Sequence, residues 1–194
     1  EAVATKKTEV CKKIVNNDTY REQCVSTIIL NQIKLATSST GWLDITLCES
    51  VVDEYKDGCK RDVQAKNSLD AFVSAQSNTN INWCDAITDI ALKNSCRDQV
   101  LAREAKSNNN IALCLKITDE DGKMRCQTNV VRTADSNHYR QARDNDDIES
   151  CNKIQSLDTK NKCNDTVYYS RALKNQDVNL CDKIVQSAQK SQCQ

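Results

Sequence analysis

The chain has 194 residues with no proline, three glycines and an aromatic fraction of 4%, a composition that favours helices joined by short polar turns over a β-sandwich. Its 27 basic and 27 acidic residues are interspersed and balance to a net charge of zero, so we expect neither nucleic acid nor an anionic membrane surface as a partner. No apolar run approaches the roughly 20 residues of a transmembrane helix, and we expect no membrane insertion.

Twelve cysteines form six pairs along the chain, and the separations within a pair are 13, 11, 12, 12, 12 and 12 in chain order. The intervals between successive leading cysteines are 37, 36, 30, 37 and 30, and such periods are typical of helical repeats. We therefore predict an all-α fold, an α-solenoid of six helical hairpins in one domain over residues 1–194. The pairs are Cys11/Cys24, Cys48/Cys59, Cys84/Cys96, Cys114/Cys126, Cys151/Cys163 and Cys181/Cys193, in repeats at approximately 1–40, 41–79, 80–109, 110–146, 147–176 and 177–194.

Each repeat is expected to begin with a short helix around its leading cysteine. Three residues after that cysteine the chain always has isoleucine or valine, which gives one narrow apolar stripe. Four residues before it, five repeats have an Asp or Asn that can accept hydrogen bonds from the first turn. In chain order these predicted N-caps are Asp44, Asn80, Asn110, Asp147 and Asp177.

A longer helix is expected to follow, carrying the second cysteine of each pair. An aliphatic residue four positions after that cysteine predicts the packing surface between repeats. From the second cysteine to the next leading one the gaps are 24, 25, 18, 25 and 18, and the difference is close to two helical turns. Loop is the alternative for part of the extra length, as in SSTGWLD before Ile45. The predicted inter-repeat packing residues are Ile28, Val63, Val100, Val130 and Val167.

The paired cysteines are predicted to form one disulfide within each hairpin. Two cysteines at similar distances from a tight turn can meet across an antiparallel helix pair. Each bond would close a loop of about a dozen residues and contribute roughly 3 kcal/mol. Zinc is disfavoured because no cysteines are two to four residues apart and His138 is the only histidine. Reduced, buried cysteines in a cytosolic protein remain the alternative.

Other polar residues have ordinary structural explanations. His138 has no paired nucleophile and is expected on a helix surface. The acidic residues Asp144, Asp146, Asp147 and Glu149 lack the EF-hand layout of a calcium site. Trp42 and Trp83 are expected to precede short helices and to pack between repeats, with ligand binding as the alternative. We expect no catalytic residue, no metal and no cofactor.

A basic residue recurs three positions before every second cysteine. We expect its long side chain to cover the disulfide while its charge stays in water. A basic row along the array is the alternative. These residues are Arg21, Lys56, Lys93, Lys123, Lys160 and Lys190.

The six cysteine pairs and their flanking Ile or Val positions resemble the tetratricopeptide and Sel1-like class of helical-hairpin repeats. Within that class the chain looks most like secreted bacterial members that close each hairpin with a disulfide. The resemblance covers the whole chain but concerns architecture alone, because the tetratricopeptide Trp-Leu-Gly-Tyr and closing proline pattern is missing. It implies a repeat scaffold and carries no binding residues over.

The expected function is that of a non-enzymatic structural or protein-binding scaffold, secreted and located outside the cell, at its surface or in a periplasm. The partner is expected to be a protein, and a second copy of this chain is one such partner. Ala2 falls nine residues before a leading cysteine, as Ala172 does, and the last helix stops just after Cys193. These ends predict head-to-tail association into filaments, and frayed ends of a truncated chain are the alternative. The alternative is a ligand- or glycan-binding module that uses the concave face.

Overall fold

The computed structural model describes residues 8–36 and 41–194, and every regular element among them is a helix. The all-α prediction of six helical hairpins is confirmed. The chain divides into two compact units, residues 1–100 and residues 101–194, and each is described by itself. Ala2 and the first three residues of the segment SSTGWLD lie outside the described residues.

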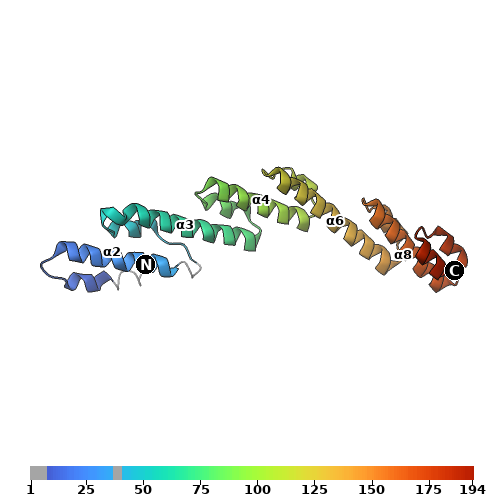
Figure 1. Cartoon of the computed structure of the whole chain (residues 1–194), viewed down its shortest axis with the longest axis horizontal. Helices are drawn as coiled ribbons and strands as arrows, with labels where there is room; N and C mark the ends of the chain where they lie inside the picture. Colours follow the sequence, from blue (N-terminus) through green and yellow to red (C-terminus); the bar gives the residue numbers. More distant parts are fainter. Residues whose placement is uncertain (1–7, 37–40) are drawn as a thin grey trace. The chain divides into compact units, whose positions relative to one another are not determined.

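In the first unit, short 3₁₀ helices alternate with long α-helices. η2 and η3 pack against α3, and α2 packs against η1, η2 and α3. Figure 1 shows these short helices lying against the long ones. The elements are η1 (Glu9–Lys13), α2 (Asp18–Ala36), η2 (Ile45–Ser50), α3 (Asp53–Asn78), η3 (Ile81–Ala86) and α4 (Ile90–Ser107), the last of which continues into the second unit.

The second unit repeats the same alternation. α6 packs against α5, α7 and α8, and α8 packs against α7, η4 and α9. Neighbouring hairpins therefore pack in chain order inside the unit, as a helical-repeat fold requires. The elements are α5 (Ile111–Cys114), α6 (Glu120–Asn145), α7 (Ile148–Asn152), α8 (Leu157–Asn175), η4 (Val178–Lys183) and α9 (Ser187–Cys193).

The short helices begin at the predicted caps. Each of the five Asp or Asn side chains accepts a hydrogen bond from the backbone N–H two residues later, which satisfies a donor of the first turn. The acceptors are Asp44, Asn80, Asn110, Asp147 and Asp177, with N···O distances of 2.9 to 3.1 Å. Five of the six predicted short helices thus have their caps confirmed.

Four long helices, α3, α4, α6 and α8, end without glycine, in a left-handed turn. The residue five positions before the next leading cysteine has positive φ, and the alanine nine positions before that cysteine is buried. The left-handed conformation lets the backbone N–H of this residue and that of the following residue donate hydrogen bonds to carbonyls of the last helical turn. The small alanine lets the following short helix approach closely. The αL residues are Thr79, Asn109, Asp146 and Gln176, and the alanines are Ala75, Ala105, Ala142 and Ala172.

The long helices come in two lengths, as predicted. α3 and α6, at the gaps of 25, have 26 residues, whereas α4 and α8, at the gaps of 18, have 18 and 19. The difference of seven or eight is close to two turns, so the longer helices keep the same face toward the core. The extra chain after α2 is not helix between residues 41 and 44, which agrees with the loop alternative for that segment.

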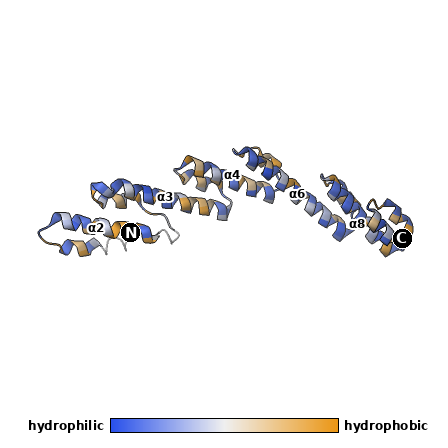
Figure 2. Ribbon diagram, in the orientation of Figure 1, coloured by the Kyte–Doolittle hydropathy of each residue, from blue (hydrophilic) through white to orange (hydrophobic). Residues whose placement is uncertain are grey.

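The core consists of small clusters, each built from the end of one long helix and the hairpin that follows. One cluster joins Ala71 and Ala75 of α3 to Ile87 and Val100 around the Cys84–Cys96 bond. Figure 2 shows hydrophobic residues in short stretches between longer hydrophilic ones. Thin clusters of this kind bury little apolar area per residue, so cross-links matter to stability.

Four of the five predicted packing residues lie in buried positions. Val63, Val100, Val130 and Val167 are at most 3% exposed. Ile28 is only half-buried. In α2, Ile29 and Ile33 lie in the cluster with Val63 instead, because residues four apart share a helix face and Ile28 points about 100° away from Ile29.

The six disulfides join the cysteines of each predicted pair. Their Cα atoms are 5.6 to 5.8 Å apart, within the range that the bond requires. No cysteine of the described residues is free. The alternative of reduced cysteines is not what the structure has, and six disulfides are typical of an oxidising compartment.

Two of the bonded cysteines are less enclosed than the others. Cys24 and Cys193 are only half-buried, although both form their predicted bonds. The other ten are at most 4% exposed. Among the described residues, the Cys11–Cys24 bond is therefore more open to solvent than the bonds of the inner hairpins.

Candidate functional site

Two buried carboxylates tie long helices to the turns of the hairpins that follow. Asp165 of α8 is fully buried, and its two oxygens accept hydrogen bonds from the backbone N–H groups of Val185 (2.7 Å) and Gln186 (2.9 Å). Asp135 of α6 accepts from Gln155 (2.8 Å) and Ser156 (3.0 Å) in the same way. Each carboxylate lies just before the start of a helix, where the helix dipole favours negative charge.

Buried serines have the same role in the first unit. Ser26 of α2 accepts from the N–H of Val52 at 3.0 Å, and Ser68 of α3 lies 3.4 Å from both the N–H and the hydroxyl of Thr88. We call Ser26, Ser68, Asp135 and Asp165 the turn anchors. Each fixes one hairpin to the next through backbone groups that would otherwise lack a partner inside the protein.

Reasoning from the sequence missed the turn anchors, although a signal for them was present. The anchors Ser68, Asp135 and Asp165 stand at one constant offset before Cys84, Cys151 and Cys181, and Asp98 stands at the same offset before Cys114, whereas Ser26 does not share it. A serine or aspartate in a polar helix is usually a surface residue, so the pattern becomes informative only through its fixed offset from the cysteines.

A groove of about 900 Å³ lies between α6 and the first turns of α8. Its α6 wall follows the spacing of one helix face, because residues three, four and seven apart lie above one another. We call this the α6–α8 groove. It is lined by Ile111, Gln127, Thr128, Val131, Arg132, Asp135, Ser136, Tyr139, Ser156, Thr159 and Lys162.

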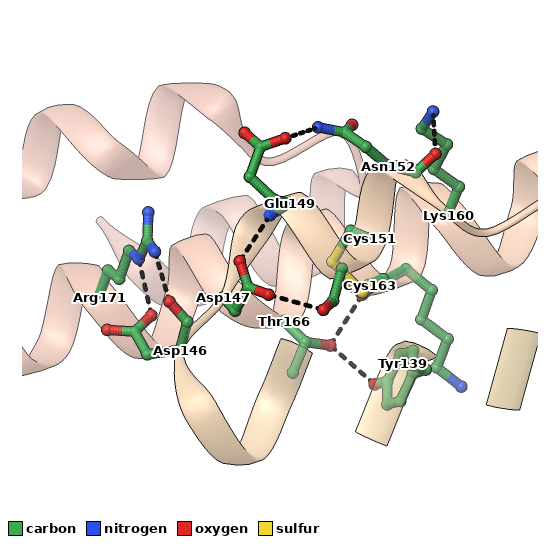
Figure 3. Close-up of a disulfide and its surroundings, with 12 residues drawn as sticks. Tyr139, Asp146, Asp147, Glu149, Cys151, Asn152, Lys160, Cys163, Thr166 and Arg171 are labelled. Atoms are coloured by element: carbon green, nitrogen blue, oxygen red, sulfur yellow. Dashed lines mark hydrogen bonds and ion pairs between the residues drawn. A yellow bond between two sulfur atoms is a disulfide. The ribbon is translucent and has the colours of Figure 1, made fainter. Parts of the chain in front are cut away.

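The α6–α8 groove has an apolar centre and two cations. Val131 and Tyr139 are half-buried, and the Tyr139 hydroxyl lies 2.9 Å from the Thr166 hydroxyl, which holds the ring in place (Figure 3). Arg132 and Lys162 are exposed and make no ion pair within residues 8–36 and 41–194. The groove therefore offers apolar contact together with positive charge.

The anionic residue of the groove lining is already engaged. Asp135 is 4% exposed, and both its oxygens are occupied by backbone N–H groups. Among the described residues it makes no ion pair with Arg132 or Lys162. Asp135 therefore has a structural role in the groove wall, while Arg132 and Lys162 are available to bind an anionic group.

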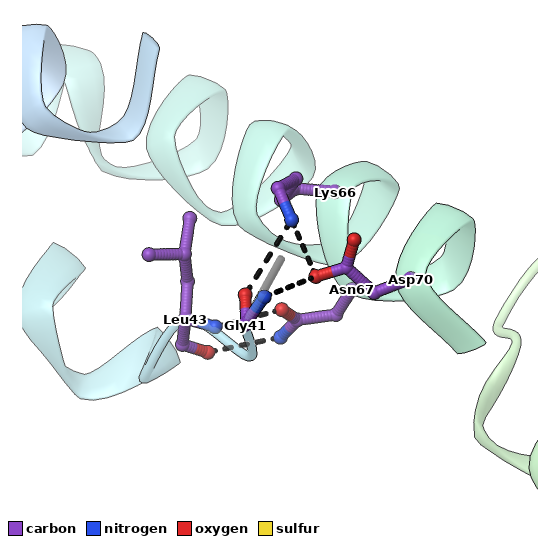
Figure 4. Close-up of polar contacts among 5 residues, drawn as sticks. All are labelled: Gly41, Leu43, Lys66, Asn67 and Asp70. Atoms are coloured by element: carbon purple, nitrogen blue, oxygen red, sulfur yellow. Dashed lines mark hydrogen bonds and ion pairs between the residues drawn. The ribbon is translucent and has the colours of Figure 1, made fainter. Parts of the chain in front are cut away.

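In the first unit, side chains of α3 hold the loop at residues 41–44, which we call the pinned loop, and Trp42 of this loop contacts Trp83. The Asn67 side chain donates to and accepts from the backbone of Leu43, both at 2.9 Å, while Lys66 contacts Asp70 and the Gly41 carbonyl (Figure 4). Trp42, between the pinned residues, has its ring centroid 6.4 Å from that of Trp83. Their exposed fractions are 49% and 37%, so the pair is in contact but still open to solvent.

The only histidine is less exposed than predicted. His138 is half-buried on α6, and its Nδ1 is enclosed with no hydrogen-bond partner. The prediction that His138 lies on the helix surface is therefore wrong for its Nδ1. The ring stands at the position of α6 that corresponds, by distance from the helix start, to the fully buried Ala71 of α3, which explains its partial enclosure.

The acidic residues near 144–149 hold local structure. Asp146 pairs with Arg171 at 2.7 Å and Asp147 caps α7 (Figure 3). Asp144 pairs with Arg143, and Glu149 accepts from Asn152. Among the described residues, no group of three or more His, Cys, Asp or Glu side chains is placed to hold a metal ion.

Three of the six recurring basic residues bind backbone rather than only covering the disulfide, and Lys56, Lys123 and Lys190 form ion pairs with carboxylates. Lys93 Nζ donates to the carbonyl of Asp85 at 3.1 Å, and Lys160 Nζ donates to that of Asn152 at 3.3 Å (Figure 3). Arg21 donates to the Ile14 carbonyl. These bonds satisfy carbonyls at or after the end of the short helix, a structural role that a row of free charges would not have.

Several surface carboxylates are held in the ionised form. The Ser150 hydroxyl donates at 2.6 Å and lowers the pKa of Asp147. The Arg97 guanidinium lowers the pKa of Asp85, and the N–H of Thr46 lowers that of Asp44. Because folding depresses these pKa values, the stability that they contribute is present above the usual aspartate pKa and is lost as pH falls through the folded values.

No protein-family model, curated protein or solved structure matches the chain. None of the described helices combines the length and the apolar character needed to cross a membrane.

Proposed function

We propose that the protein is a non-enzymatic repeat scaffold of an oxidising compartment, secreted to the cell surface, the extracellular space or a periplasm, and that it binds a segment of another protein. The observation that carries this proposal is the α6–α8 groove. Its walls are fixed by the Asp135 anchor and by the Cys151–Cys163 bond. A fixed site of this kind loses little conformational entropy on binding.

The dimensions of the groove favour a peptide segment over a small metabolite. Its α6 wall runs from Gln127 to Tyr139, a helical rise of about 18 Å. An extended chain covers that distance with about five residues. The mixture of apolar, hydroxyl and charged side chains along the wall suits several consecutive side chains of a partner, since polar groups fix orientation and apolar ones provide contact.

A displayed peptide library tests the proposal. Ser136 and Asn137 are neighbours on α6 and both are exposed, but only Ser136 lines the groove. Ser136→Trp should fill the groove, and Asn137→Trp is the matched control. We expect peptides enriched on the native protein to bind Asn137→Trp equally and to lose at least tenfold in affinity for Ser136→Trp. If no enriched peptide is blocked by Ser136→Trp, the proposal fails.

Glycan binding is a second candidate, favoured by the exposed Trp42–Trp83 pair. Sugar rings stack on the faces of exposed aromatic side chains, and the pinned loop holds Trp42 in place. These are the chain's two tryptophans, so their fluorescence reports on this site directly. A saturable fluorescence change on titration with oligosaccharides, lost in Trp42→Ala, would favour this candidate over the peptide scaffold.

Head-to-tail self-association stays a prediction, which light scattering over a concentration series tests.

A further inference from the structure

The two cations of the α6–α8 groove differ from most basic residues near them. Lys123, Arg125, Arg143 and Arg171 all pair with carboxylates at 2.6 to 3.2 Å. Arg132 on the α6 wall and Lys162 on the α8 wall line the groove instead. Each is without an ion pair in the part of the chain that the structure describes.

The repeat itself shows that the framework does not need these cations. α3 begins at Asp53 and α6 at Glu120, both with 26 residues, and α4 begins at Ile90 while α8 begins at Leu157. The offset in sequence is the same for both pairs of helices. At this offset, residues with the same structural role coincide. The disulfide residue Cys59 matches Cys126, the packing residue Val63 matches Val130, and the turn anchor Ser68 matches Asp135.

At the same offset, Arg132 matches Ala65 and Lys162 matches Ser95. Both Ala65 and Ser95 are exposed. An uncharged residue therefore satisfies the fold at each position, and the charges of Arg132 and Lys162 serve something other than packing.

Resting on the proposed function, we infer that the α6–α8 groove takes an acidic segment of a partner protein, an extended stretch with carboxylate side chains beside an apolar residue. The Arg132 guanidinium offers a planar pair of donors that matches a carboxylate, and Lys162 supplies a second charge from the facing wall. Val131 and Tyr139 contact the apolar residue. Asp135 binds backbone N–H groups and makes no ion pair with either cation among the described residues, so the partner's carboxylates meet the cations directly.

The test uses Arg132→Ala and Lys162→Ser, singly and combined, in the full chain. These are the residues that the chain itself has at the matched positions, so we expect unchanged circular dichroism and melting temperature. Peptides selected on the native protein and blocked by Ser136→Trp should be net acidic. A synthetic copy of one such peptide should lose at least tenfold in affinity when its glutamates are replaced by glutamines, and the same loss should follow from the double variant.

The glutamine peptide should bind the native protein and the double variant alike, because its contacts are apolar and neutral. Raising the salt concentration should weaken the acidic peptide alone. If peptides blocked by Ser136→Trp are neutral or basic, or if the double variant binds the acidic peptide unchanged, the inference is overturned while the proposed scaffold function stands. If Ser136→Trp blocks no peptide, the function itself is overturned.

Discussion

Reduction of all six disulfides should unfold the protein at room temperature. Each bond closes a loop with a sequence separation of 11 to 13 residues, which is worth about 3 kcal/mol in the chain-entropy treatment. The six together exceed the roughly 5–15 kcal/mol by which ordinary domains are stable. The apolar clusters cannot replace them, since the cluster around Ile154 and Val167 itself includes Cys151 and Cys163.

The measurement is far-UV circular dichroism on protein treated with a phosphine reductant and then alkylated, with mass spectrometry to count modified cysteines. Protein exposed to the alkylating agent without reductant is the control and should keep its helical spectrum. Full helicity with every thiol alkylated would show that packing alone holds the hairpins, contrary to this expectation.

The second large effect is expected from Asp165→Ala. The side chain is fully buried and accepts from two backbone N–H groups ahead of α9. Removing it leaves both donors without their acceptor, and each such loss costs about 1–3 kcal/mol. We expect the free energy of unfolding of the second unit to fall by about 3–5 kcal/mol, measured by urea denaturation.

Asp165→Ser is the graded control. A serine serves as the anchor at Ser26, where its hydroxyl accepts one N–H bond. Asp165→Ser should therefore recover part of the loss, and its unfolding free energy should lie between those of the native protein and Asp165→Ala. Equal stability of the native protein and Asp165→Ala would remove the anchor role.

Local features of the fold could be predicted because they depend on nearby residues. The pairing of Cys84 with Cys96 follows from a constant separation, and the cap at Asn80 follows from the chemistry of a free first turn. The prediction that Ile28 packs between repeats rested on the distance from the second cysteine that holds in the other repeats. In α2, Ile29 and Ile33 pack against the neighbouring helices instead. One residue on a helix is a rotation of about 100°.

The candidate sites could not be predicted because they depend on residues that the repeat does not share. Trp42 and Trp83 meet only because Asn67 and Lys66 hold the intervening loop on α3. Arg132 and Lys162 face one groove only because α6 and α8 pack together. Asp135 was missed for a different reason: an aspartate in a polar helix is ordinarily exposed.

The short separation inside each cysteine pair has a consequence for how the chain would acquire its bonds if it is exported, as the proposed function requires. In a chain delivered N-terminus first through a membrane pore, Cys151 and Cys163 emerge together, before Cys181 is available. Closing so short a loop costs less chain entropy than closing a longer one, so the two thiols of one pair meet more often than thiols of different pairs. The native partner is therefore favoured whenever an oxidant acts on the emerging chain.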